Sequence, residues 1–139
     1  MSCHYTILPH LGLVHVRFSG IVRPQDSLEA LKNYSTDRRA ASELNQLLDM
    51  RDVTGMDMNV VDMLKVHAQK AEIFCAAETD RLFVHLAPTT VAQKIAGFAV
   101  RSWEHVPGIT HRIVRTEEQA LQILGLRETS ISALVQQQV

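Results

Sequence analysis

LNQLLDMRDVTGMDMNVV, residues 44–61, is the stretch that decides the fold. It opens with an apolar run that predicts a buried strand over residues 46–50. The run is followed by an acidic bend and then by the start of a long amphipathic helix, and the bend carries Asp49, Asp52 and Asp57. In an open α/β sheet, ligands and partners usually bind at the carboxyl end of such a strand. We therefore expect the candidate site at this corner.

On both sides of this stretch, short β-type runs alternate with segments of helical periodicity. We expect strands over residues 5–8, 13–19, 46–50, 82–86 and 111–115. The order is β-β-α-β-α-β-α-β-α, which indicates an α/β fold with a single mixed, mostly parallel sheet flanked by helices. The first two strands form an antiparallel hairpin. We expect Gly20 to close the second strand, with His15 and Arg17 on its wet face.

Polar residues at the expected helix starts predict where each helix begins. Pro24 suits a first helical turn, and Asp57 or Asn59 can cap the helix that follows the bend. Two capping-box pairs open the later helices, Thr90 with Gln93 and Thr116 with Gln119. Gly125 is a plausible cap at the end of the last of these helices.

The 139 residues suit one domain, which we expect over residues 1–126. Residues 127–139 form an extension that could add a short helix through Ile131 and Leu134. It packs on the domain, packs on a second subunit or stays loose, and the sequence leaves these alternatives open. A homodimer is plausible through this tail or through the edge of the first hairpin.

Composition narrows the classes of function. A formal net charge of −1 and 5% aromatic residues count against nucleic-acid binding. The two cysteines, Cys3 and Cys75, form no CxxC motif, which favours a reduced cytoplasmic protein with an inert Cys75 thiol. No apolar run approaches the roughly 18 residues of a membrane span, and the amino-terminal residues do not resemble a signal peptide.

Four segments together resemble the SpoIIAA-like family: the first hairpin, LLDMRDV (47–53), LFVHLAPT (82–89) and HRIVRTEEQALQILGL (111–126). That family is grouped with the STAS domains of anti-sigma-factor antagonists and, more distantly, with the Sec14-type lipid-binding fold. The resemblance covers roughly residues 5–126. It implies a small mixed sheet flanked by helices.

The resemblance also locates a regulatory turn. In antagonist-type STAS domains, a serine in a DSSG-like turn at a helix start is phosphorylated to control partner binding. Here that turn falls on Asp57, Met58, Asn59 and Val60, and only Asp57 matches. The resemblance therefore implies a docking surface that lacks the phosphoacceptor serine.

Each candidate site has a chemical and a structural interpretation. Asp49 and Asp52, with Arg51, could supply acid–base chemistry or hold a cation, but capping of backbone N–H groups is favoured. Thr89 and Thr90 precede a helix whose N–H groups could bind an anion shared with Arg51, although simple capping is again favoured.

The histidines and methionines are likewise expected to be structural first. None of the seven histidines forms an HxxxH, HxH or HExxH pair, and His67 and His85 are expected as hydrogen-bonded core residues. We therefore expect no metal, no cofactor and no catalytic residue. A methionine cluster near the bend is read as core, with an apolar-ligand surface as the alternative: Met50, Met56, Met58 and Met63.

Three hypotheses of function follow. The first is a non-enzymatic binding or regulatory module that docks a protein partner through residues 49–61 and the outer face of the next helix, with Asp62, Lys65 and Gln69. The second is a small apolar-ligand or lipid-binding domain of the Sec14-like type, with its mouth between Met56, Met63, Val91 and Phe98. An enzyme using Asp49 or Asp52 is the third. A cavity of roughly several hundred Å³ beside the third helix would favour a ligand, and an exposed patch near Asn59 would favour a partner.

Overall fold

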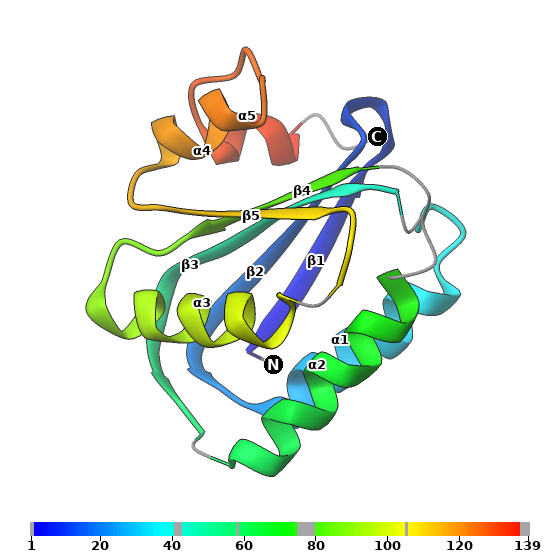
Figure 1. The fold of residues 1–139 in the computed structure, drawn as a ribbon. Helices are drawn as coiled ribbons and strands as arrows, with labels where there is room; N and C mark the ends of the chain where they lie inside the picture. Colours follow the sequence, from blue (N-terminus) through cyan, green and yellow to red (C-terminus); the bar gives the residue numbers. More distant parts are fainter. Residues whose placement is uncertain (1, 41–42, 58, 75–79, 105, 137–139) are drawn as a thin grey trace.

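A computed structural model describes residues 2–40, 43–57, 59–74, 80–104 and 106–136. The chain forms an α/β fold with a single five-stranded mixed sheet, as the sequence predicts (Figure 1). Strands β1 and β2 are antiparallel, and the other neighbouring pairs are parallel, in the order β1-β2-β3-β4-β5. The elements are β1 (Cys3–Leu8), β2 (Leu13–Val22), α1 (Pro24–Thr36), β3 (Asn45–Met56), α2 (Val60–Phe74), β4 (Arg81–Leu86), α3 (Thr90–Ser102), β5 (Ile109–Val114), α4 (Glu117–Ile123) and α5 (Ile131–Gln136).

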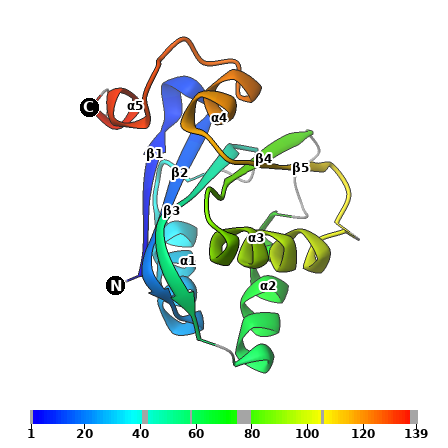
Figure 2. The same cartoon turned by 90° about the vertical axis from the view of Figure 1, so that its left-hand side faces the viewer.

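The helices cover the two faces of the sheet separately (Figure 2). Helices α1, α2 and α3 pack on one face, over a core that contains Val14, Leu48 and Phe83. Helices α4 and α5 pack on the other face, over a second core that contains Leu47 and Val84. Adjacent residues of β3 and β4 thus point to opposite cores, and both strands are buried on both faces as their apolar runs predict.

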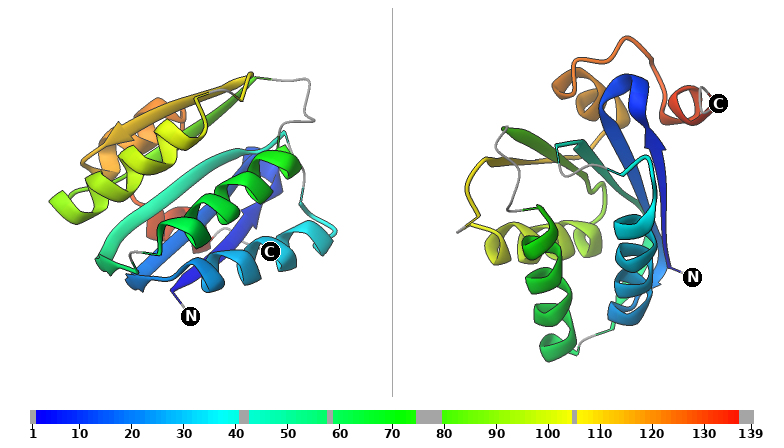
Figure 3. Two further views of the ribbon diagram at one scale, coloured as in Figure 1. Left: turned by 60° about the horizontal axis from the view of Figure 1, so that its bottom comes forward. Right: turned by 90° about the vertical axis from the view of Figure 1, so that its right-hand side faces the viewer.

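On the larger face, α1 and α2 lie side by side (Figure 3). Helix α3 contacts β3 and β5. None of the helices in the described ranges is long and apolar enough to span a bilayer.

Strands β2 and β3 run further than the sequence predicts, and the expected bend over residues 51–56 is a continuation of β3. Two register shifts make this possible: Arg17 pairs with Asp49 and Ser19 with Asp52, then Gly20 with Val53 and Ile21 with Gly55. Each shift leaves one extra residue in β3, which is a β-bulge. Gly20 does not end β2, because its φ of +64° lets the backbone pass the second shift without steric cost.

Helix α5 belongs to the core of this domain. Ile131 and Leu134 are fully buried, and they pack with Leu8 and Leu13 of the first hairpin. His15 is also buried, at 6% exposure, so the expectation of a wet face on β2 is wrong at Leu13 and His15. The reason is tertiary: residues from the far end of the described chain cover this part of the face.

Truncating Leu134 tests this packing. We expect Leu134→Ala to lower the free energy of unfolding by about 3 kcal/mol, because it removes a large apolar side chain from a closed core. Ile123→Ala on α4 is the matched control, since Ile123 is 41% exposed and should lose well under half as much. Urea unfolding followed by the fluorescence of Trp103 measures both. Equal losses in the two variants would show that α5 does not close the core.

Candidate functional site

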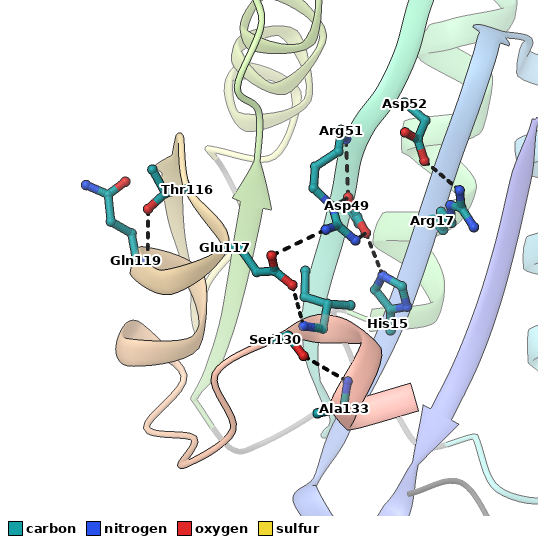
Figure 4. A network of polar contacts seen from close by, with 11 residues as sticks. His15, Arg17, Asp49, Arg51, Asp52, Thr116, Glu117, Gln119, Ser130 and Ala133 are labelled. Carbon is teal, nitrogen blue, oxygen red and sulfur yellow. Dashed lines mark hydrogen bonds and ion pairs between the residues drawn. The ribbon is translucent and has the colours of Figure 1, made fainter. Parts of the chain in front are cut away.

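The carboxylate of Asp49, at the predicted corner, makes four polar contacts with His15 and Arg51 (Figure 4). Its Oδ2 lies 3.0 Å from Nε2 of His15 on β2 and accepts a hydrogen bond of 2.8 Å from Nη2 of Arg51. Its Oδ1 accepts from Nε of Arg51 at 2.9 Å and from the Arg51 backbone N–H at 3.2 Å. Parallel pairing of β2 with β3 brings His15 close to Asp49. Arg17 is the register partner of Asp49, and His15 lies two residues before Arg17 on β2.

Asp49 is ionised and inaccessible. Its side chain is only 2% exposed. Burial by itself would raise the pKa of this carboxyl, but the hydrogen bonds from His15 and Arg51 outweigh it and hold the pKa well below the ordinary value. The same contact raises the pKa of the Arg51 guanidinium.

Arg51 extends the network to the helices on this face. Its Nη1 lies 3.6 Å from Oε2 of Glu117, in the first turn of α4. Oε1 of Glu117 accepts a hydrogen bond from the backbone N–H of Ile131, which begins α5. Ser130 caps the same helix by accepting from the N–H of Ala133. One chain of contacts thus joins the β3 bulge to α4 and α5.

The contacts of this network join parts of the same protein and stabilise its fold. The N–H of Arg51 lies in the bulge, so the Asp49 carboxylate satisfies a backbone group that the irregular strand leaves free. Asp52 takes no part, because it forms a separate ion pair of 2.6 Å with Arg17 and both side chains are more than half exposed. The two carboxylates therefore have different partners and do not form an acid–base pair. Asp49 does accept a hydrogen bond from a nearby backbone N–H, as the capping interpretation expects. It does so in a buried position, and not at a bend exposed to solvent.

The start of α2 brings together four of the predicted site residues. Oδ1 of Asn59 accepts from the N–H of Asp62 at 3.2 Å, so Asn59 is the cap. Asp57 is exposed and its Oδ1 accepts from the N–H of Asn59 at 3.3 Å. Met56 is partly buried against the larger core, and Met63 is buried within the protein. Met58 lies outside the described residues.

The start of α3 differs from the prediction by one residue. Thr89 is the cap, and its Oγ1 accepts from the N–H of Ala92 at 3.1 Å. Thr90 is already helical and exposed, and the Gln93 side chain donates to the carbonyl of Ala87. Arg51 is engaged by Asp49 and Glu117, so it does not share an anion site with this helix. The capping interpretation of this segment is therefore the one that the geometry favours.

The start of α4 follows its prediction more closely. Oγ1 of Thr116 accepts from the N–H of Gln119, as expected, but Oε1 of Gln119 accepts from Arg115 and does not return to Thr116. Gly125 has a φ of +71°, and the N–H of Leu126 donates to the carbonyl of Leu121, which is the expected glycine cap.

The predicted core histidines lie on the opposite face of the sheet from Asp49. Nδ1 of His67 accepts from Nε1 of Trp103 at 3.0 Å, and burial lowers the pKa of His67 to about 3. Nε2 of His85 lies 3.2 Å from Nδ1 of His111, and burial lowers the pKa of His85 to about 3 as well. Both predictions of hydrogen-bonded core histidines are confirmed. Within the described ranges, no group of three acidic, cysteine or histidine residues is placed to hold a metal ion.

The nine predicted site residues thus divide among four places: the buried network, the exposed ion pair of Asp52 with Arg17, the start of α2 and the start of α3. Met50 is a core residue, and Cys75 lies outside the described residues. His15 and Glu117 were not predicted as partners of the network. A signal existed for Glu117, which stands in a first helical turn, but its contact with Arg51 depends on where α4 packs.

Comparison with known proteins adds no assignment to this geometry. Neither a protein-family model nor a curated protein matches the chain.

Neutralising Asp49 should destabilise the protein strongly. We expect Asp49→Asn to cost about 3 kcal/mol at pH 7, because it removes the negative charge and replaces one of the two acceptor oxygens by an NH2 group that faces the donors of His15 and Arg51. Asp52→Asn is the matched control, and loss of its exposed ion pair should cost at most about 1 kcal/mol. Thermal unfolding at pH 7 measures both variants.

The same pair of proteins gives a pH test. The folded-state pKa of Asp49 is depressed, so its stabilisation is complete above the unfolded pKa of about 3.9 and declines as the pH falls through it. The stability gap between wild type and Asp49→Asn should therefore narrow by about 1 kcal/mol between pH 7 and pH 3. A gap that is constant or that widens towards acid would contradict the assignment.

Proposed function

We propose that this chain is a non-enzymatic docking module of the SpoIIAA-like type, which binds a protein partner at the start of α2. The mixed sheet with an antiparallel first hairpin is the architecture that the resemblance implies, and it supports the proposal. The absence of a serine at Met58 and Asn59 means that docking here does not use the phosphorylation of antagonist-type STAS domains.

The observation that carries the proposal is the exposure of two aliphatic side chains in the first turns of α2. Val61 is 62% exposed and Leu64 is 52% exposed. They stand at i and i+3, so they are neighbours on one side of the helix. The Asn59 cap and the hydrogen bond between Asp57 and Asn59 fix the helix start that presents them. We call Val61 and Leu64, with the flanking Asp57 and Asp62, the α2 patch.

The charged residues around the α2 patch indicate which kind of partner it binds. Asp57 is exposed and Asp62 is partly exposed, and neither takes part in an ion pair among the described residues. Lys65, at i+4 from Val61, is also exposed, so the border carries two carboxylates and one amine. The carboxylates of Asp57 and Asp62 fit a segment that presents apolar side chains with lysine or arginine beside them. A basic amphipathic helix has this arrangement, and it binds through side chains at i, i+3 and i+4.

The cavities give less support to the lipid-binding alternative. Two cavities beneath α1, α2 and α3 have volumes of about 40 Å³ and about 30 Å³. Neither is lined by Met56, Met63, Val91 or Phe98, where the mouth of a ligand site is expected from the sequence. A lipid chain needs a far larger pocket than either cavity offers. Two surface hollows are larger, about 530 Å³ between α1 and α2 and about 460 Å³ beside α4, but neither is lined by any of those four residues.

Site-specific photo-crosslinking in the native host tests the docking proposal. A photoreactive residue at position 61 should capture one partner, and the added change Leu64→Asp should reduce its yield at least tenfold. The same photoreactive residue at position 123 is the matched control, because Ile123 is also exposed but lies on α4.

The captured partner is then purified and titrated with the intact protein. We expect Asp62→Lys to weaken binding at least fivefold, and Ile123→Asp to change it less than twofold. Capture of a second copy of this chain, or of a partner whose binding ignores Leu64 and Asp62, would overturn the proposal.

A further inference from the structure

The two cavities beneath the helices adjoin one another. They share three lining residues, Gln46 and Leu48 of β3 and Lys70 of α2. Register pairs place Val14 beside Gln46 and Phe83 beyond it, so the cavities follow one row across the face of the sheet. Lys70 extends from α2 over β2, and its Nζ lies 5.8 Å from the centre of the ring of Phe18, which stands four residues further along β2 than Val14.

The two cavities differ in chemistry. The larger has an apolar wall from β2 and α1, which includes Val14, Val16, Leu31 and Tyr34. The smaller is bordered by aromatic and imidazole rings, which include His67, His85, Trp103 and His111. Lys70 and Gln46 stand between the two, so they are placed to hold the polar end of a molecule whose other end is apolar.

The amine of Lys70 has no anionic partner among the described residues. Within the described part of the chain, no aspartate or glutamate lines either cavity, and Lys70 takes part in none of the ion pairs. Burial lowers the pKa of its amine, which reflects the cost of a charge in these surroundings. A bound anion would compensate this cost, since a buried charge is stable only when it is paired.

We propose that the two cavities form one binding site for a short-chain carboxylate. The carboxylate contacts Nζ of Lys70 and the amide of Gln46, and the alkyl chain lies between Val16, Leu31 and Tyr34. A water-sized group requires about 10–15 Å³ of such volume, so the two cavities together hold about five non-hydrogen atoms. This matches propionate or butyrate and is too small for a fatty acid. The site is independent of the α2 patch.

Titration of the intact protein with sodium butyrate tests the proposal, with amide shifts in two-dimensional NMR as the measure. We expect saturable shifts in β1, β2 and α2. Neutral n-butanol and cationic n-butylamine should bind at least tenfold more weakly, because they cannot pair with Lys70. Inorganic phosphate should also bind at least tenfold more weakly, because it has no apolar part for the larger cavity.

Matched lysine variants locate the contact. Lys70→Met keeps the length of the side chain but removes the amine, and it should reduce butyrate affinity at least tenfold. Lys65→Met, on the exposed side of the same helix, should leave the affinity within twofold. Equal binding of butyrate and n-butanol to wild type, or full butyrate affinity in a folded Lys70→Met protein, would overturn the assignment. The comparison of ligands on wild type decides the question even if Lys70→Met does not fold.

Discussion

The buried carboxylate of Asp49 is the contact on which the irregular centre of this sheet depends. It accepts hydrogen bonds from the bulged backbone and the guanidinium of Arg51, and it pairs with His15 of the neighbouring strand. Through Arg51 and Glu117 it is joined to α4 and the start of α5. The Asp49 carboxylate lies where an α/β protein often binds a ligand. Here its contacts join two strands and two helices of the protein itself.

The two faces of the sheet are built in different ways. The face under α4 and α5 has a polar network in which Asp49, His15, Arg51 and Glu117 contact one another. The face under α1, α2 and α3 has unfilled volume and a lysine, Lys70, that forms no ion pair with any residue the structure describes. If both proposals hold, a small anion bound beside Lys70 and a protein bound at the α2 patch would contact the same helix. Helix α2 would then be the element through which one occupant could influence the other.

The order of strands and helices could be predicted from the sequence because it depends on local periodicity. Strand ends were harder, because the bulges in β3 and the positive φ of Gly20 depend on pairing between strands. His15 was expected in solvent because the alternation in β2 contains no information about α5. Capping by Asp49 could be predicted, and Asn59 was one of two candidates for the cap of α2, since capping acts within two or three residues. The Lys70 cavities could not be predicted, because their walls come from several separate elements.

The second core joins segments that are far apart in the chain. Leu8 and Leu13 of the first hairpin pack with Ile131 and Leu134 of α5. During synthesis, the hairpin leaves the ribosome long before α5 has been translated, since chains grow by about 5–20 residues per second. The apolar side of β1, β2 and β3 must therefore stay uncovered for several seconds in the nascent chain. Until α5 is made, incomplete chains present this apolar surface to chaperones and to one another.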